Sequence, residues 1–179
     1  MKFAETAIRG AFLVDLERIE DARGFFARTW CAQEFAAHGL TAKLEQCSIS
    51  YNKKRGTLHG MHYQAAPHQE AKLVRCTSGA AYDVIVDARA DSPTAGLHVG
   101  INLAHGAPTM LYVPEGVAHG YITLADDTEL SYLISVPYEP RSQRGFRWND
   151  PAVGIQWPLA PSCISPRDAA LPPFSERER

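Results

Sequence analysis

The stretch AKLVRCTSGAAYDVIVD, residues 71–87, decides the fold. Its two halves, Ala71–Cys76 and Ala80–Asp87, are short and contain many β-branched and aromatic residues, which are enriched in strands. The letters TSG at positions 77–79 form a turn signal between the two halves. The stretch therefore predicts two strands separated by a tight turn.

Similar segments lie on both sides of this stretch. We expect further strands at Leu44–Asn52, Val99–Leu103, Thr109–Val113, His119–Leu124 and Glu129–Val136. Turn signals that contain glycine, proline or aspartate separate these segments. Many short strands at this spacing predict an all-β sandwich or barrel.

Helices are expected at the edges of this pattern. Thr29 is a candidate N-cap for a helix over Trp30–His38, and Gly39 stands where helices commonly end. The proline-rich tail from Pro158 onward predicts an irregular chain with a short helix. We expect its end, Ser175–Arg179, to be frayed.

The composition predicts one domain over residues 1–179, with a sizeable core because 45% of the residues are hydrophobic. The net charge of −2 argues against nucleic acid or an anionic membrane as the main partner. We expect no targeting segment and no membrane span. The four cysteines, Cys31, Cys47, Cys76 and Cys163, form no CxxC pair, which favours reduced, buried thiols in a cytoplasmic protein.

Strand parity predicts which side chains point inward. Lys72 shares a face with Val74 and Cys76, so the lysine is expected to point into a barrel. Tyr132 shares a face with Leu130 and Ile134 and is also expected to point inward. A core tyrosine with a satisfied hydroxyl explains Tyr132 equally well at this point.

Two segments contain histidines at suggestive spacing. The second, PEGVAHG at 114–120, matches the PxGxxH pattern of cupin jelly rolls, which places His119 inside the barrel. The first, GTLHGMHYQ at 56–64, lacks the HxH pair of a metal-binding cupin, because Gln64 stands two residues after His62. His59, three residues before His62, faces the opposite side in a regular strand. The spacing disfavours a metal site.

Without a metal, these residue types suit proton transfer next to a carbonyl. A histidine in an enclosed pocket acts as a general base near neutral pH, and a carboxylate fixes its tautomer. A buried lysine stabilises an enolate oxygen, and a tyrosine returns a proton to the other face of the carbanion. This set of roles describes epimerisation.

The chain resembles the dTDP-4-dehydrorhamnose 3,5-epimerases, cupin-fold enzymes of deoxysugar synthesis, from about Phe12 to Asp168. The matching pieces are DARGFF at 21–26, GTLHGMHYQ at 56–64, AKLVRC at 71–76, DVIVD at 83–87, SPT at 92–94, PEGVAHG at 114–120 and WNDP at 148–151, followed by GI at 154–155 and WP at 157–158. The resemblance implies a cupin-type jelly-roll barrel with short peripheral helices, no metal or other cofactor, and a homodimer with exchanged N-terminal strands.

The resemblance also implies a role for individual residues. His62 matches the base, Asp168 its paired carboxylate, Tyr132 the acid on the opposite face and Lys72 the lysine beside the keto oxygen. Positions that line the substrate or nucleotide site are matched by Arg23, Phe26, Gln46, His119 and Tyr138.

Other ligand-side positions depart from the family pattern. His59 stands where an arginine that helps to hold the diphosphate is usual, Ser48 where asparagine is common, and Gln143 near a frequent glutamate. Arg28 and Leu133 also replace a glutamate and a lysine that are common there. We therefore expect an epimerase acting at C3, at C5 or at both carbons of a nucleotide-diphosphate-linked 4-keto-6-deoxyhexose, as in rhamnose-type biosynthesis, or one acting on a different nucleotide sugar. A metal-dependent cupin and a non-catalytic sugar-binding cupin are the less favoured alternatives.

Overall fold

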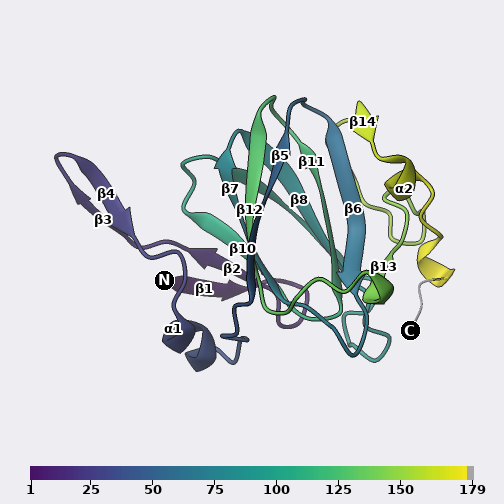
Figure 1. The fold of residues 1–179 in the computed structure, drawn as a ribbon, viewed down its shortest axis with the longest axis horizontal. Coiled ribbons are helices and arrows are strands. Elements are labelled where there is room, and N and C mark those ends of the chain that lie inside the picture. Colours follow the sequence, from purple (N-terminus) through teal and green to yellow (C-terminus); the bar gives the residue numbers. More distant parts are fainter. Residues whose placement is uncertain (177–179) are drawn as a thin grey trace.

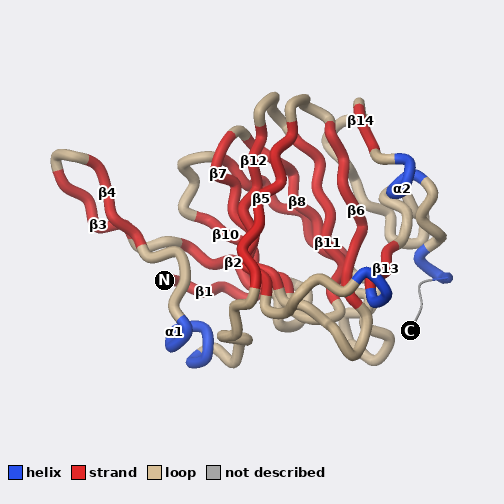
Figure 2. Tube along the Cα trace, viewed as in Figure 1, coloured by secondary structure: helices blue, strands red, loops and turns tan. Residues whose placement is uncertain are grey.

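The computed structural model describes residues 1–176, which form two large β-sheets that face each other (Figures 1 and 2). In spatial order, the first sheet contains β1 (Lys2–Glu5), β2 (Phe12–Asp15), β10 (Thr109–Val113), β7 (Lys72–Ser78), β12 (Thr128–Ile134) and β5 (Gln46–Asn52). The second contains β13 (Gln143–Gly145), β6 (Thr57–Gln64), β11 (Val117–Thr123), β8 (Ala80–Asp87) and β9 (His98–Ala104), with β14 (Cys163–Ile164) beside β6. The predicted all-β, cupin-type jelly-roll class is confirmed, although the two sheets remain separate rather than closing into one barrel within residues 1–176.

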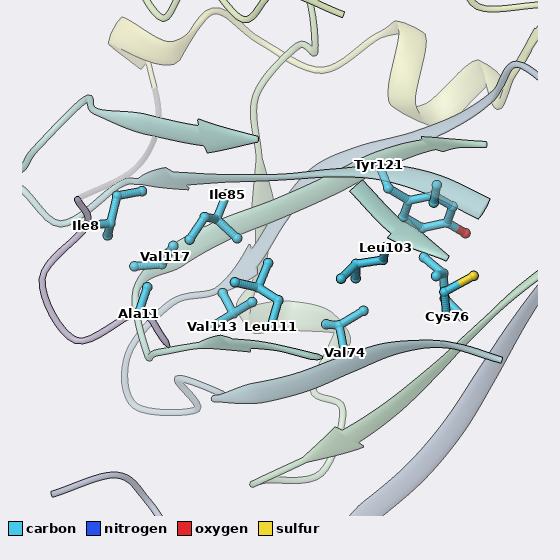
Figure 3. Packing of buried hydrophobic residues seen from close by; sticks show 12 residues of the cluster. Ile8, Ala11, Val74, Cys76, Ile85, Leu103, Leu111, Val113, Val117 and Tyr121 are labelled. Atoms are coloured by element: carbon cyan, nitrogen blue, oxygen red, sulfur yellow. The ribbon is translucent and has the colours of Figure 1, made fainter. Parts of the chain in front are cut away.

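The main core lies between the two sheets (Figure 3). Val74 and Leu111 of the first sheet pack in one cluster with Ile85, Leu103 and Val117 of the second. Within a strand, the residues of this cluster stand at alternate positions, as Val74 and Cys76 do on β7. Inner-facing side chains therefore fill the space between the sheets, apart from one region where polar residues line a pocket.

Short peripheral elements cover the outer faces. Helix α1 (Ala32–Ala37) contributes Phe35 to a cluster with Leu73 and Met110 on the outer side of the first sheet. Segments of the C-terminal tail, including η2 (Phe174–Glu176), pack against Met61 and other outward residues of the second sheet. Lys72 and Leu73 therefore point to opposite sides of the first sheet, as parity predicts.

All seven predicted strands are confirmed, with their ends displaced by at most two residues. The structure also contains strands that were not predicted: β1, β2, β6, β13, β14 and the hairpin of β3 (Arg18–Asp21) and β4 (Gly24–Ala27). The hairpin has little buried surface and hence no alternating pattern. Gly60 interrupts the pattern of β6.

The predicted helix near the N-terminus is confirmed in position but not in its cap. Cys31, not Thr29, is the N-cap residue of α1, and no side chain caps the helix. Gly39 does follow the helix end, with φ at 69°. The tail is largely irregular, as expected, with short helices at α2 (Pro166–Ala169) and η2; residues 177–179 of the segment expected to be frayed lie outside the described residues.

The hairpin β3–β4 projects away from both sheets (Figure 1). Ile19, Phe25 and Phe26 on this hairpin are exposed, with Phe26 at 72%. Ile19 and Phe26 are therefore left mostly uncovered by the described residues of this chain, whereas the Arg18 guanidinium lies 4.3 Å from the centre of the Phe25 ring.

The described residues contain no helix that is long and apolar enough to cross a membrane.

All four cysteines are free thiols, and Cys76 is buried as expected. The expectation of burial is wrong for Cys47 and Cys163, which are exposed because Cys47 lies on the edge strand β5 and Cys163 on the short strand β14.

Candidate active site

A pocket of about 270 Å³ opens between the two sheets. Its lining combines histidines, tyrosines, glutamines, one lysine and one glutamate with a few small or apolar residues: Ser48, Ile49, Ser50, His59, His62, Tyr63, Gln64, Glu70, Lys72, His119, Gly120, Tyr121, Tyr132, Ile134, Tyr138 and Gln143. The two sheets contribute different chemistry. Lys72 and Tyr132 come from the first sheet, whereas His59, His62 and His119 come from the second.

His62 is held by Asp168. Its Nε2 lies 2.9 Å from Asp168 Oδ1, and the backbone N–H of Gly60 donates to the other carboxylate oxygen at 3.2 Å. Burial raises the pKa of the Asp168 carboxyl, but the hydrogen bond from His62 and the Gly60 N–H more than offset it, so the pKa lies below its usual range. With Nε2–H donating to Asp168, Nδ1 is the nitrogen left to accept a proton.

Helix α2 positions Asp168. The N-cap residue Ser165 accepts a hydrogen bond from the Asp168 backbone N–H at 3.0 Å, and Pro166 occupies the first turn. The cysteine and isoleucine of β14 pair with β6 in parallel just before this helix. The tail thus returns to the strand that carries His62, and the Asp168 side chain is buried there.

A second histidine–aspartate pair lies beside the first. His119 Nε2 donates to both carboxylate oxygens of Asp83, at 2.9 and 3.0 Å. Both residues are buried, at 6% and 0% exposure. His62 is more accessible, with 26% of its side chain exposed. Accessibility therefore separates the two histidines: His62 presents its ring more openly to the pocket.

Tyr132 lies against His119, with the two rings 5.9 Å apart and nearly perpendicular. Burial raises the pKa of the Tyr132 phenol well above its usual range, and Tyr121 and Asp83 add to this rise. Tyr132 therefore keeps its proton at neutral pH, as a proton donor must. Tyr121 in turn hydrogen-bonds with Ser50 Oγ at 2.7 Å and with Asn52 Nδ2 at 3.1 Å.

His59 lines the same pocket as His62, so the expectation that they face opposite sides is wrong. The register of β6 and β11 shifts between the pairs His119–His62 and Tyr121–His59. Gly60 lies at this irregularity with φ at 114°, and a Cβ there would lie 2.6 Å from the Cα of Gly120. This irregularity breaks the alternation of side chains along β6, so His59 and His62 both reach the same pocket.

His59 is packed and hydrogen-bonded rather than free. Its ring stacks on Tyr121 with centroids 4.9 Å apart, and Nε2 lies 2.8 Å from Asn52 Oδ1. Burial lowers the pKa of His59, and His62 and His119 lower it further, against the attraction of Asp168. His59 thus gives the pocket a neutral imidazole at pH 7.

Lys72 forms an ion pair with Glu70 inside the pocket. The Lys72 Nζ lies 2.7 Å from Glu70 Oε1, and the two side chains are 13% and 10% exposed. The inward direction predicted for Lys72 and Tyr132 is confirmed, since both line the pocket.

The remaining predicted site residues divide between the rim and the hairpin. Gln46 Oε1 accepts from the Tyr138 backbone N–H at 2.8 Å, and the Tyr138 hydroxyl contacts Gln143 at the pocket rim. Ser48 lines the pocket. Arg23 and Phe26 do not line the pocket of their own chain; they lie on the projecting hairpin, where Arg23 pairs with Asp21.

No role in the site was predicted from the sequence for Asp83 or Tyr121. Asp83 had a usable signal, because a carboxylate within the apolar strand YDVIV is rarely buried without a partner. Gln64 stands at the position of a second metal-binding histidine. Its side chain instead donates to the backbone carbonyl of His68 and accepts from the backbone N–H of Glu139. Within residues 1–176, no group of three or more histidine, cysteine, aspartate or glutamate side chains could hold a metal ion.

A jelly roll that places a histidine paired with an aspartate on one side of a pocket, and a tyrosine and a lysine on the other side, has the groups of a cupin-type epimerase. Comparison with known proteins agrees. Residues 5–176 match the dTDP-4-dehydrorhamnose 3,5-epimerase family. The chain belongs to this family of isomerases.

Individual relatives are similar over nearly their whole length. A dTDP-4-dehydrorhamnose 3,5-epimerase from Sinorhizobium fredii is 37% identical, with 98% of this chain and 91% of that protein covered. The crystal structure of the enzyme of the same name from Elizabethkingia anophelis has a TM-score of 0.94 at 32% identity, covering 98% and 97% of the two chains. A 3'-monoepimerase from Streptomyces bikiniensis in complex with dTDP-quinovose has a TM-score of 0.87 at 31% identity, covering 95% and 86%.

Proposed function

We propose that the chain, as a single domain over residues 1–179, epimerises a nucleotide-diphosphate-linked 4-keto-6-deoxyhexose next to its ketone. The observation that carries this proposal is the placement of His62, paired with Asp168, on one sheet and Tyr132 on the other, around one pocket. A sugar ring between the sheets has one face toward the base and the other toward the acid.

The reaction follows from this arrangement. His62 Nδ1 takes the proton from the carbon beside the ketone, and Asp168 stabilises the imidazolium that forms. Lys72 donates a hydrogen bond to the enolate oxygen. Tyr132 then delivers its phenolic proton to the opposite face of the carbon, which inverts the centre. Before the next cycle, the phenolate regains a proton from solvent and the His62 imidazolium releases its proton to solvent.

The substrate is tested by incubating the purified chain with dTDP-4-keto-6-deoxyglucose in D₂O. NMR follows deuterium incorporation at C3 and C5 separately. Turnover with inversion supports the proposal and shows whether one or both carbons exchange. Stable protons at both carbons would remove this substrate and leave a different nucleotide sugar, which the neutral His59 in place of a diphosphate-binding arginine favours.

We further propose a cytoplasmic homodimer in which the hairpin of one chain supplies Arg23 and Phe26 to the pocket of its partner. The exposed apolar hairpin supports this, because it lies apart from the pocket of its own chain. Mixing an Arg23→Ala/Phe26→Ala variant with an His62→Asn variant tests it. Heterodimers with one intact composite site restore activity, whereas self-contained sites leave the mixture inactive.

A further inference from the structure

One carboxylate in the pocket has no part in the reaction just described. Glu70 lies two residues before Lys72, and its side chain is only 10% exposed. A negative charge at this place opposes both the binding of an anionic diphosphate and the growth of charge on an enolate. Its presence beside the pocket therefore calls for a function that outweighs this opposition.

The contact with Lys72 suggests that function. A lysine side chain is a long flexible stem with a compact ammonium, and it adopts many positions when nothing holds it. The backbone of Lys72 is fixed between Val113 and Ile134 of the neighbouring strands. Glu70 Oε1, at 2.7 Å from Nζ, fixes the other end. One of the three ammonium donors is thereby occupied, and the directions of the other two are restricted.

We infer that Glu70 is a positioning residue, which anchors the Lys72 ammonium so that its remaining donors point at the keto oxygen of the substrate. This inference rests on the proposed epimerase function. A donor fixed in advance at the place where charge develops stabilises the transition state without reorganisation, whereas a mobile ammonium must first be ordered. Glu70 therefore acts through Lys72 and touches no reacting atom.

A double-mutant cycle with Glu70→Gln and Lys72→Met tests this action through the lysine. Glu70→Gln removes the charge with little change of shape and is expected to lower kcat for deuterium exchange by roughly 10–100-fold, with KM changed less than about threefold. In the Lys72→Met background the same substitution is expected to change kcat less than about twofold, because the group it positions is gone. Equal losses in both backgrounds, or wild-type kcat in Glu70→Gln, would overturn the inference.

The Lys43–Glu45 pair supplies a matched control. It has the same spacing in the sequence and a separation of 3.1 Å, but its side chains are 57% and 41% exposed. Glu45→Gln is expected to leave kcat unchanged. Thermal unfolding verifies that each variant folds. Should Glu70→Gln not fold, Glu70→Asp, which keeps the charge, takes its place with a smaller expected loss of kcat that again disappears in the Lys72→Met background.

The wild-type measurement separates this inference from the proposed function. If the wild-type chain exchanges no proton of dTDP-4-keto-6-deoxyglucose or of a 4-keto-6-deoxyhexose linked to another nucleotide diphosphate, the epimerase function and the role of Glu70 are both contradicted. If the wild type exchanges protons while the two substitutions act independently, the epimerase function stands and only the role of Glu70 falls.

Discussion

His62 on β6 lies directly opposite His119 on β11, and each imidazole is held by its own carboxylate. The carboxylates come from different parts of the chain: Asp168 from helix α2 and Asp83 from strand β8. The pair around His119 is buried, while His62 is partly open to the pocket. The two pairs thus differ in exposure, and we assign proton abstraction to the more exposed histidine, His62.

Asp168→Asn is expected to lower kcat by roughly 10²–10⁴-fold, because an amide neither stabilises the imidazolium nor enforces the tautomer with a free Nδ1. Deuterium exchange at C3 and C5 measures the loss, and binding of dTDP is expected to be unaffected. Asp91→Asn, in an exposed loop, is the control with unchanged kcat. An Asp168→Asn variant with near-normal exchange would remove this carboxylate from the mechanism.

Tyr132→Phe separates proton abstraction from inversion. His62 and Tyr132 lie on opposite sheets, so loss of the phenol leaves abstraction on the His62 side intact. We expect solvent exchange with retention to persist while inverted product falls by roughly 10²-fold or more. NMR of the recovered sugar distinguishes the two outcomes. Normal inversion in Tyr132→Phe would show that another group is the acid.

Regular strands explain what the sequence predicted about the site. The register of β7 and β12 shifts only between Glu129 and Leu130, so Lys72 and Tyr132 lie in the regular part of this ladder and parity placed both side chains inside. The same rule failed for His59, because the glycine at position 60 and the shifted register interrupt β6. Alternation in the sequence therefore predicts the direction of side chains only where the strand is regular.

Long-range pairing lay beyond any local pattern. Asp168 meets His62 across 106 positions of the chain, through the docking of α2 beside β6. Before the structure, only the resemblance to a family predicted that Asp168 pairs with His62. The hairpin that carries Arg23 was missed because its strands bury almost nothing and show no alternation.

Gly60→Ala is expected to destabilise the fold by about 3 kcal/mol or more, because its new Cβ would lie 2.6 Å from Gly120 Cα and 2.9 Å from His119 O. Gly106→Ala is the matched control, since Gly106 also has a positive φ of 78° but no atom within 4 Å of the added Cβ. Urea unfolding compares the two free energies. Equal, small losses would show that β6 and β11 can move apart.

Asp87 gives a prediction on pH and stability. Burial raises the pKa of this fully buried carboxyl, but Arg89, Ser92 and Thr94 donate to it, so the pKa falls from 3.8 to about 2. A lowered folded-state pKa contributes stability above the unfolded pKa, and this contribution is lost as the pH falls through the folded value. The shift corresponds to roughly 2 kcal/mol at pH 7.

We therefore expect Asp87→Asn to lower the free energy of unfolding by about 2 kcal/mol at pH 7, with a smaller difference from wild type below about pH 4. Urea unfolding at a series of pH values measures this difference, with Asp91→Asn as the control. A difference that stays constant down to about pH 3 would contradict the electrostatic explanation.

His62 is proposed as the base, and deuterium exchange catalysed by a His62→Asn variant measures its contribution. Exchange at C3 and C5 of the bound 4-keto sugar is expected to fall by roughly 10³-fold or more, with dTDP affinity within about threefold of wild type. Exchange at the wild-type rate in a folded His62→Asn variant would contradict it.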